Sequence, residues 1–417
     1  MTTWYRVSVD ESALYVHFMQ GPNRYWDPAE VAQQPLALQG ATGRRAVLTG
    51  PGSVWMYAHA AATLRAAGAT SLEVSLPHQP VANHDLTGSD CQLIRGQPGE
   101  RVAVLRWHLR PEPPVAREAI NRLVEPRFEE LAQLRPETLV LSGRAGVELY
   151  ARAAWAAVDC GVRELLCWSA RDGLILVFES DQAGGVRSLP RPQWLNRLLP
   201  LSARCVVLGV AGDPNLGKSL FSSVLDWYGQ QLGVECWRLD ADGQSPTPPW
   251  YLWQTQAAPN MARGLRNQHK RPWTPQMEAS IADQIHRGRE LFDVLIVDLP
   301  GGDHRTEPPL RIPPGRERLF LPLDVIVLLS RESDPLGDAW RDALRAHDCE
   351  RKVAAMLVSR EPHGAPSLTV SYETSPWGGV VTGLDRSRST ADLGRAYREA
   401  LEQLWKELLQ WEPTTRG

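Results

Sequence analysis

The sequence has few of the features that place a chain in a specialised class of protein. Its six cysteines are scattered without a C-x-x-C pair, which predicts buried thiols of a reducing compartment and no disulfide framework. No apolar run is long enough for a membrane-spanning helix, and residues 1–4 do not begin a signal peptide. The net charge of −3 argues against electrostatic binding of nucleic acid over the whole protein surface. These absences predict a soluble globular protein of the cytoplasm.

The composition is that of an ordinary globular chain. Of its 417 residues, 43% are hydrophobic and 22% are charged, and a chain of this length forms about two to four domains. The order of expected elements divides it into residues 1–100, 101–195 and 200–417. The expected fold class is α/β, with two small duplicated α/β domains followed by a doubly wound domain that has a mostly parallel sheet.

One stretch carries a recognisable chemistry. The apolar run 205–210 is followed by G-x-x-x-x-G-K-S over residues 212–219 and then by a helix-compatible segment, which is the context that this phosphate-binding motif requires. Backbone N–H groups of such a loop, and the helix N-terminus behind it, favour phosphate oxygens. We expect Lys218 to reach the β- and γ-phosphates of ATP, from an exposed position in the ligand-free loop, and the Ser219 hydroxyl to ligate Mg²⁺. The predicted nucleotide-binding residues are Gly212, Asp213, Pro214, Asn215, Leu216, Gly217, Lys218, Ser219 and Leu220.

A second apolar run, residues 292–297, ends in an acid. In P-loop proteins an acid at this place holds Mg²⁺ or one of its water ligands. Asp298 is therefore predicted to be the second Mg²⁺-binding residue and to be catalytic together with Lys218. Gly301 and Gly302 follow, where the chain can bend near a γ-phosphate.

Two more acids, Asp240 and Asp242, follow the expected strand 234–239. They can orient an attacking water, touch Mg²⁺ or accept a proton from a substrate hydroxyl, and these roles make them candidate catalytic residues. They can equally form a turn, because the Asp-Gly pair at 242–243 favours one. The sequence leaves both interpretations open. The Pro- and Trp-rich segment 240–271 is expected to be a long loop that acts as a lid or a binding surface.

The segment after residue 200 alternates strands and helices, which predicts the doubly wound sheet. The expected elements there are strands 205–210, 234–239, 293–298, 324–330 and 352–359 and helices 218–231, 275–290, 336–347 and 390–411.

The first half of the chain contains a repeat. A strand, a glycine-containing turn, a helix and a second strand occupy residues 46–76 and return, 93 positions later and without a gap, from residue 138. The repeated identities predict a duplication. The identical pairs are Gly50/Gly143, Val54/Val147, Tyr57/Tyr150, Ala58/Ala151, Ala60/Ala153, Ala61/Ala154, Gly68/Gly161 and Leu72/Leu165. The two tyrosines are expected to pack in the core.

Residues 49–57, Thr-Gly-Pro-Gly-Ser-Val-Trp-Met-Tyr, resemble the G-x-G-P-hydrophobic-Trp segment of the CRISPR-associated ring nuclease three family (Csx-three) of type III CRISPR systems. Some members of that family carry such domains fused to a C-terminal P-loop ATPase, and residues 212–219, 240–243 and 298–302 agree with its ATPase part. The resemblance implies binding of cyclic tetra-adenylate, often in a homo-oligomer. Some members also cleave the ring.

The sequence departs from this family where the family cleaves its ligand. The family's Asp-Pro-Arg is Leu-Pro-His at 76–78 and Ser-Ala-Arg at 169–171, neither copy has the Ser-His, and the metal-binding histidine is replaced near Ala62. The resemblance therefore implies binding with weak or lost cleavage. The implied ligand-binding residues are Gly50, Gly52, Ser53, Gly143, Arg144, Gly146 and Arg171. The alternative for the glycines is a tight β–α turn, and for the arginines a surface position.

Three functions stay open at this point. The leading one is a signalling ATPase that senses a cyclic oligoadenylate. The second is a kinase that phosphorylates a small molecule or a nucleic-acid end, with Asp240 or Asp242 as base and the segment 244–271 as acceptor site. The third is a non-enzymatic switch whose nucleotide state controls assembly with a partner.

Overall fold

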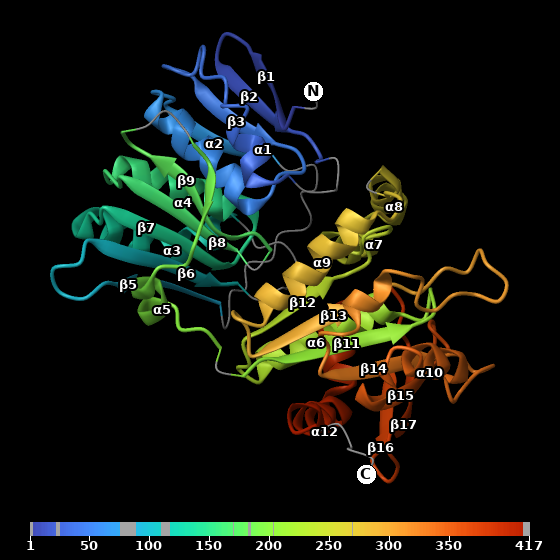
Figure 1. The fold of residues 1–417 in the computed structure, drawn as a ribbon. Helices are drawn as coiled ribbons and strands as arrows, with labels where there is room; N and C mark the ends of the chain where they lie inside the picture. Colours follow the sequence, from blue (N-terminus) through green and yellow to red (C-terminus); the bar gives the residue numbers. More distant parts are fainter. Residues whose placement is uncertain are drawn as a thin grey trace. The chain divides into compact units, whose positions relative to one another are not determined.

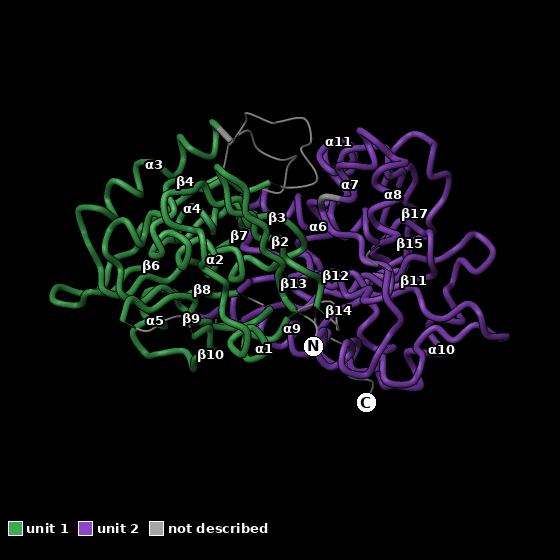
Figure 2. The backbone as a smooth tube through the Cα atoms, turned by 90° about the horizontal axis from the view of Figure 1, so that it is seen from above, with its two compact units in different colours: residues 1–200 green, residues 201–417 purple. Residues whose placement is uncertain are grey.

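The computed structural model describes residues 3–21, 26–75, 89–109, 117–169, 171–181, 185–202, 204–268 and 270–411. The chain divides into two compact units, which we call unit 1 (residues 1–200) and unit 2 (residues 201–417) (Figures 1 and 2). None of the described helices combines the length and the apolar character needed to cross a membrane. All six cysteines are free thiols; four of them are buried as expected, whereas Cys160 and Cys205 are only partly buried.

Unit 1 contains two sheets that each pair an antiparallel hairpin with two further parallel strands, and the second sheet also has the antiparallel strands β9 and β10. The first has the order β1-β2-β3-β4 and consists of β1 (Tyr5–Val9), β2 (Ala13–Phe18), β3 (Arg45–Thr49) and β4 (Ser71–Ser75). The second has the order β10-β9-β8-β7-β6-β5 and consists of β5 (Asp90–Arg95), β6 (Val102–His108), β7 (Thr138–Arg144), β8 (Glu164–Ser169), β9 (Gly173–Glu179) and β10 (Arg187–Leu189). The helices of unit 1 are α1 (Pro28–Ala32), α2 (Val54–Ala66), α3 (Arg117–Leu134), α4 (Val147–Asp159) and α5 (Gln193–Leu198).

The two β–α–β segments of unit 1 agree in detail. β3, α2 and β4 begin at positions that lie 93 residues before the starts of β7, α4 and β8. In each segment a helix tyrosine donates a hydrogen bond to the carbonyl of the glycine in the preceding turn, from Tyr57 to Gly50 and from Tyr150 to Gly143, both at 2.8 Å.

Both of these glycines need their missing side chain. Their φ angles are 99° at Gly50 and 111° at Gly143, a region that L-residues rarely adopt. A Cβ atom would lie 2.4 Å from Phe18 O in the first copy and 1.9 Å from Trp107 O in the second. The turn can therefore approach the neighbouring strand only because the residue is glycine.

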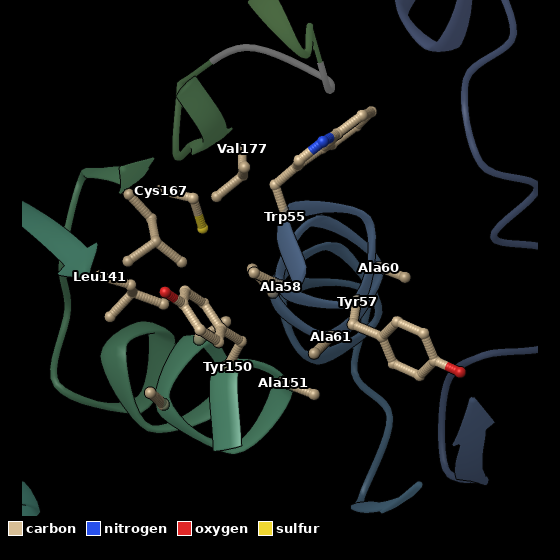
Figure 3. Packing of buried hydrophobic residues seen from close by; sticks show 14 of the residues in the cluster. Trp55, Tyr57, Ala58, Ala60, Ala61, Leu141, Tyr150, Ala151, Cys167 and Val177 are labelled. Atoms are coloured by element: carbon tan, nitrogen blue, oxygen red, sulfur yellow. The ribbon is translucent and has the colours of Figure 1, made fainter. Parts of the chain in front are cut away.

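Helices α2 and α4 pack against each other in the core of unit 1. Figure 3 shows Ala61 of α2 on the side of that helix that faces Ala151 of α4, and small side chains at such positions let two helices come close. Tyr57 points away from α4, whereas Tyr150 points toward Leu141 (Figure 3). Both tyrosines are buried, which confirms the expected core role.

Unit 2 is built on a seven-stranded sheet with the order β12-β13-β11-β14-β15-β17-β16, parallel except for β16. Its strands are β11 (Val206–Gly212), β12 (Cys236–Asp240), β13 (Val294–Asp298), β14 (Val325–Ser330), β15 (Val353–Arg360), β16 (Ser367–Ser371) and β17 (Trp377–Thr382). Its helices are α6 (Lys218–Gln231), α7 (Pro249–Ala257), α8 (Pro259–Gln268), α9 (Pro275–Gly288), α10 (Asp338–Arg345), α11 (Thr390–Ala396) and α12 (Arg398–Leu409), with 3₁₀ turns η1 (Arg316–Leu319) and η2 (Glu350–Lys352).

Helices cover both faces of this sheet (Figure 1). Alternate side chains along its strands are therefore buried in two clusters, one on each face. Leu208 and Val210 of β11 pack in the cluster that contains α6, α11 and α12. Val207 and Ala211 pack in the cluster that contains α9 and α10. The predicted doubly wound, mostly parallel architecture of residues 200–417 is therefore present in the structure.

Several boundaries differ from the sequence-based expectation. The segment 240–271 is not one long loop, because it contains α7 and α8. The helix expected over 390–411 is broken at Tyr397 into α11 and α12. Strand β5 pairs with β6, so it belongs to the second sheet, although the expected first domain includes residues 90–95. The expected domains 1–100 and 101–195 lie in one unit with a shared buried cluster.

Candidate functional site

The loop between β11 and α6 is shaped by residues with unusual backbone angles. Gly212 ends β11 with φ of 136°, and a Cβ atom there would lie 2.3 Å from Leu329 O of β14. Asn215 has φ of 65°, a conformation that asparagine adopts more readily than most residues. Gly217, with φ of 83°, precedes the first residue of α6. Left-handed residues inside a loop turn successive N–H groups toward one side, which creates a concavity suited to anions.

Lys218 begins α6 and folds back over this loop. Its side chain is 8% exposed, and Nζ donates a hydrogen bond to Asp213 O at 2.8 Å. The expectation that this lysine is exposed in the ligand-free loop is therefore wrong, because the loop's own carbonyl holds the ammonium. Burial lowers the pKa of Lys218, while the nearby Asp298, Asp242 and Asp213 act in the opposite direction.

Asp298 lies at the end of β13, the strand beside β11, as the sequence predicts. Its Oδ2 atom forms an ion pair with Nη2 of Arg238, and both side chains are buried. Its Oδ1 atom is also buried and has no hydrogen-bond partner within the described ranges. A buried carboxylate oxygen with free lone pairs is costly unless a ligand satisfies it.

The sequence reasoning missed Arg238. Its guanidinium joins three elements: Nε donates to Ser222 Oγ of α6 at 2.7 Å, Nη1 donates to Thr247 O before α7 at 3.0 Å, and Nη2 pairs with Asp298. The available signal was a charged residue inside the short strand Cys-Trp-Arg-Leu-Asp of β12, where a buried parallel strand normally carries apolar residues.

The donor set fits Mg²⁺. Magnesium keeps several water ligands and is held by one or two carboxylates together with substrate phosphates, not by a dedicated protein cage. Asp298 Oδ1 offers the free carboxylate oxygen, and Ser219 lies in the first turn of α6 beside Lys218. The described residues contain no group of three or more His, Cys, Asp or Glu side chains that would form an all-protein site.

Asp240 and Asp242 organise the turn after β12. Asp240 accepts hydrogen bonds from the backbone N–H groups of Asp242 at 3.1 Å and Thr247 at 2.6 Å. Asp242 Oδ1 accepts from those of Gln244 at 3.1 Å and Ser245 at 3.0 Å. The turn interpretation is therefore confirmed. A chemical role for these acids stays a prediction, and Asp242 is near enough to Lys218 to influence its pKa.

The chain after Asp298 returns to the loop 212–219 between β11 and α6, which we call the phosphate-type loop because its sequence matches the phosphate-binding motif. A Cβ atom on Gly301 would lie 2.8 Å from Pro214, so the backbone of Gly301 is packed directly against this loop. His304 Nε2 lies 2.9 Å from Gly301 O. A cavity of about 290 Å³ opens beside Asp213, and His304 and Arg311 reach it from the segment after β13.

The predicted ligand residues of unit 1 form two equivalent turns. Gly50, Gly52 and Ser53 precede α2, and Ser53 is its N-cap without a side-chain capping bond. Gly143 and Arg144 end β7.

In the second turn Gly146 is the N-cap of α4, which matches the place of Ser53 before α2. The glycines thus occupy tight β–α turns, as the alternative interpretation stated, and ligand contact stays a prediction.

Arg171 is not a surface arginine. Its Nε atom donates to both oxygens of Asp172, at 3.0 and 2.9 Å, and Asp172 Oδ2 also accepts a hydrogen bond from Trp55 Nε1 at 3.1 Å. The guanidinium is therefore engaged within the protein and contributes to the connection between α2 and the second sheet. The departures from the family at residues 76–78 and at Ala170 lie outside the described residues.

Unit 2 thus has a strand–glycine loop–helix motif at the carboxyl edge of a mostly parallel sheet, with a buried lysine and a buried acid beside it. No family model matches the chain, and no curated protein matches it. A DUF1611 family protein from Anabaena variabilis ATCC 29413 is similar at 14% identity over 56% of this chain and 71% of its own, with a TM-score of 0.26. The signal recognition particle 54 kDa protein from Aeropyrum pernix K1, solved in complex with GDP, is similar at 12% identity over 71% of this chain and 68% of its own, with a TM-score of 0.28. Likenesses at this level carry no inference about the activity of this chain.

Proposed function

We propose that unit 2 binds ATP with Mg²⁺ at the loop 212–219 and hydrolyses it. The observation that supports this most directly is the convergence of Lys218 and Asp298 at that loop, with Asp298 Oδ1 buried and free to accept a ligand. A buried lysine beside an anion-binding loop serves a phosphate chain better than it serves the stability of the fold, because its burial carries a desolvation cost.

Each residue has a defined part in this proposal. The N–H groups of the loop hold the β-phosphate, and Lys218 exchanges its hydrogen bond to Asp213 O for the β- and γ-phosphate oxygens. Ser219 and Asp298 would hold Mg²⁺, which would neutralise phosphate charge. Arg238 fixes the position of Asp298. Asp242 orients the attacking water through the oxygen that the turn does not use.

The test is release of phosphate from γ-labelled ATP by the full chain. We expect Lys218→Ala to lower turnover by about 10²- to 10³-fold, the effect of losing one preorganised charge at a transition state. The control is Lys406→Ala, on the exposed face of α12. Equal turnover in the two variants would end the ATPase proposal.

A kinase is the second candidate, and the cavity of about 290 Å³ beside the loop favours it, because a second substrate needs space next to the γ-phosphate. This cavity is lined by residues of the loop, of the segment after β13 and of the segment around β14, and not by the segment 244–271 that the sequence suggested as acceptor site. The same assay separates the two functions. Hydrolysis yields free labelled phosphate, whereas transfer leaves the label on an acceptor. If nucleotide instead changes only the oligomeric state, the assembly switch is the better description.

For unit 1 we propose binding of cyclic tetra-adenylate, with cleavage weak or lost, in a homo-oligomer that belongs to type III CRISPR signalling. The support is the pair of equivalent glycine turns ahead of α2 and α4. Calorimetry with the full chain and cyclic tetra-adenylate tests it, and chromatography of the nucleotide after incubation tests cleavage. Arg144→Ala should weaken binding by about 1–3 kcal/mol. Absence of measurable heat in the unmodified protein would contradict the sensor role.

A further inference from the structure

The side chain of Asp213 collects an unusual number of donors. It is 6% exposed, and its carboxylate accepts hydrogen bonds from Trp340 Nε1 at 2.9 Å and from Arg331 Nε at 2.9 Å. Arg311 Nε lies 3.0 Å from it, and His304 Nε2 lies 3.4 Å away. One carboxylate therefore holds two guanidinium groups, which carry more positive charge than it can neutralise.

This cluster lines the cavity of about 290 Å³ at the carboxyl ends of β11 and β14. The chain leaves β11 toward β12 on one side of the sheet and leaves β14 toward β15 on the other. The crevice between two such strands is where open α/β sheets bind their ligands. Asp334, the other acid of the cavity, already uses Oδ1 to accept from the N–H of Asp338 at 2.9 Å.

The cavity is also directly connected with the phosphate-type loop. Asp213 is the first residue of that loop after Gly212, and its own carbonyl accepts the hydrogen bond from Lys218 Nζ. Arg311 belongs to the segment that follows Gly301, which packs on Pro214. The two arginines and the ammonium group of Lys218 therefore contact the same residue, Asp213: the arginines at its carboxylate and Lys218 at its carbonyl.

We propose that Arg311 and Arg331 bind the terminal phosphate of the nucleotide held by the loop, and that Asp213 is the internal anion they hold before it arrives. This inference rests on the proposed function of unit 2. A terminal phosphate brings more charge and one more acceptor oxygen than the carboxylate, so it competes for both guanidinium groups. The arginine that stabilises the transferred group is then supplied by the same chain and not by a neighbouring copy.

The proposal predicts discrimination between triphosphate and diphosphate. The loop and Lys218 contact the β-phosphate of both nucleotides, whereas only ATP carries the group that reaches the two arginines. The measurement is the Kd of the full chain for ATP and for ADP, each with Mg²⁺, by calorimetry. We expect Arg311→Ala to weaken ATP binding by about 10- to 100-fold and ADP binding by about twofold or less, as for a lost charge-assisted hydrogen bond.

The chain offers a matched control. Arg305 lies on the same segment after β13 but is 77% exposed and pairs with Asp303, so Arg305→Ala should leave the ratio of the two Kd values unchanged. Arg331 is 48% exposed, and its replacement disturbs packing less than that of Arg311. Arg331→Ala therefore serves as the second variant if Arg311→Ala lowers the melting temperature.

The possible outcomes distinguish a failure of this inference from a failure of the proposed function. A normal ATP-to-ADP ratio in Arg331→Ala and in a folded Arg311→Ala overturns this inference and leaves the proposed function intact. A selective loss of ATP binding in either variant supports it. An unmodified protein that binds neither nucleotide overturns the proposed function itself, and this inference with it.

Discussion

Arg238 and Asp298 form an ion pair on neighbouring strands β12 and β13, with side chains that are 3% and 2% exposed. The opposite charge of each side chain offsets part of the cost of burying the other. The pair also joins α6 and the segment before α7 through Ser222 and Thr247. It therefore serves stability and the predicted Mg²⁺ site together.

Replacing Arg238 by methionine should leave the buried negative charge of Asp298 without its ion-pair partner. We expect the free energy of unfolding of unit 2 to fall by about 3–5 kcal/mol, as for other buried pairs that lose one partner. Denaturant unfolding followed by circular dichroism measures it. Arg395→Met is the control, because Arg395 and Asp392 form an exposed pair whose loss should cost about 0.5 kcal/mol. Equal effects would show that the burial of Asp298 does not depend on Arg238.

Nucleotide affinity should depend on pH through Lys218. Burial lowers the pKa of this lysine, and an anionic ligand binds the protonated form more tightly than the neutral form. Affinity should therefore fall as the pH rises through the lowered pKa, earlier than an ordinary lysine would predict. A series of ATP Kd values against pH measures this.

Lys218→Arg provides the comparison, because arginine stays protonated over the accessible range. We expect the alkaline loss of affinity to be absent from that variant even where its affinity at neutral pH is lower. The same alkaline loss in both proteins would assign the pH dependence to another group.

Gly301→Ala should slow turnover strongly while changing the melting temperature only a little. The added Cβ would lie 2.8 Å from three atoms of Pro214, so the segment after β13 must move away from the loop. A shift of about 1 Å near the reacting groups can cost about 10²-fold in rate. Gly264→Ala in α8 is the control, since its Cβ meets nothing within 4 Å and should leave turnover unchanged. Steady-state kinetics and thermal unfolding of both variants are the measurements.

His59 should make unit 1 sensitive to acid. The side chain is buried on α2, and its Nδ1 donates to Val177 O of β9 at 2.7 Å. Burial lowers the pKa of His59, against the opposite effect of this hydrogen bond. The unfolded chain therefore binds a proton that the folded chain does not, and stability should fall by up to about 1.4 kcal/mol per pH unit below about pH 6.5.

His59→Gln removes this titration and should flatten the acid limb of the unfolding curve. His17→Gln, at an exposed position of β2, should leave the limb as it is. Urea unfolding between pH 5 and about 7.5 compares the three proteins. An unchanged slope in His59→Gln would mean that another buried group is responsible.

The features of unit 2 that the sequence predicts are local ones. Helix α6 lies at the expected residues because a glycine turn ends an apolar run and a helix-forming segment follows it. Asp298 lies at the end of β13 because the apolar run of that strand ends there. The contacts that surround them are not local. Arg238 is 60 residues from Asp298, and Arg331 is 118 residues from Asp213, so no spacing in the sequence relates them.

The elements that the sequence does not predict are missed for two different reasons. Proline favours a loop over residues 240–271, but Pro249 and Pro259 are the first residues of α7 and α8, where proline fits a helix. Strand β17 contains Gly378 and Gly379, which lowers its apparent strand propensity. The prolines are thus a local helix signal, whereas in β17 the pairing with β15 and β16 determines the strand although the local preference is weak.

The tyrosine–glycine hydrogen bond of unit 1 occurs twice within different surroundings. Phe18 packs on Tyr57 at 4.4 Å between ring centroids, whereas Trp107 packs on Tyr150 at 4.7 Å in an edge-on arrangement. The two turns therefore share one backbone geometry and one hydrogen bond, and they differ in the aromatic ring that packs on the tyrosine. A substitution at either ring changes the surroundings of the hydrogen bond without changing the backbone of the turn.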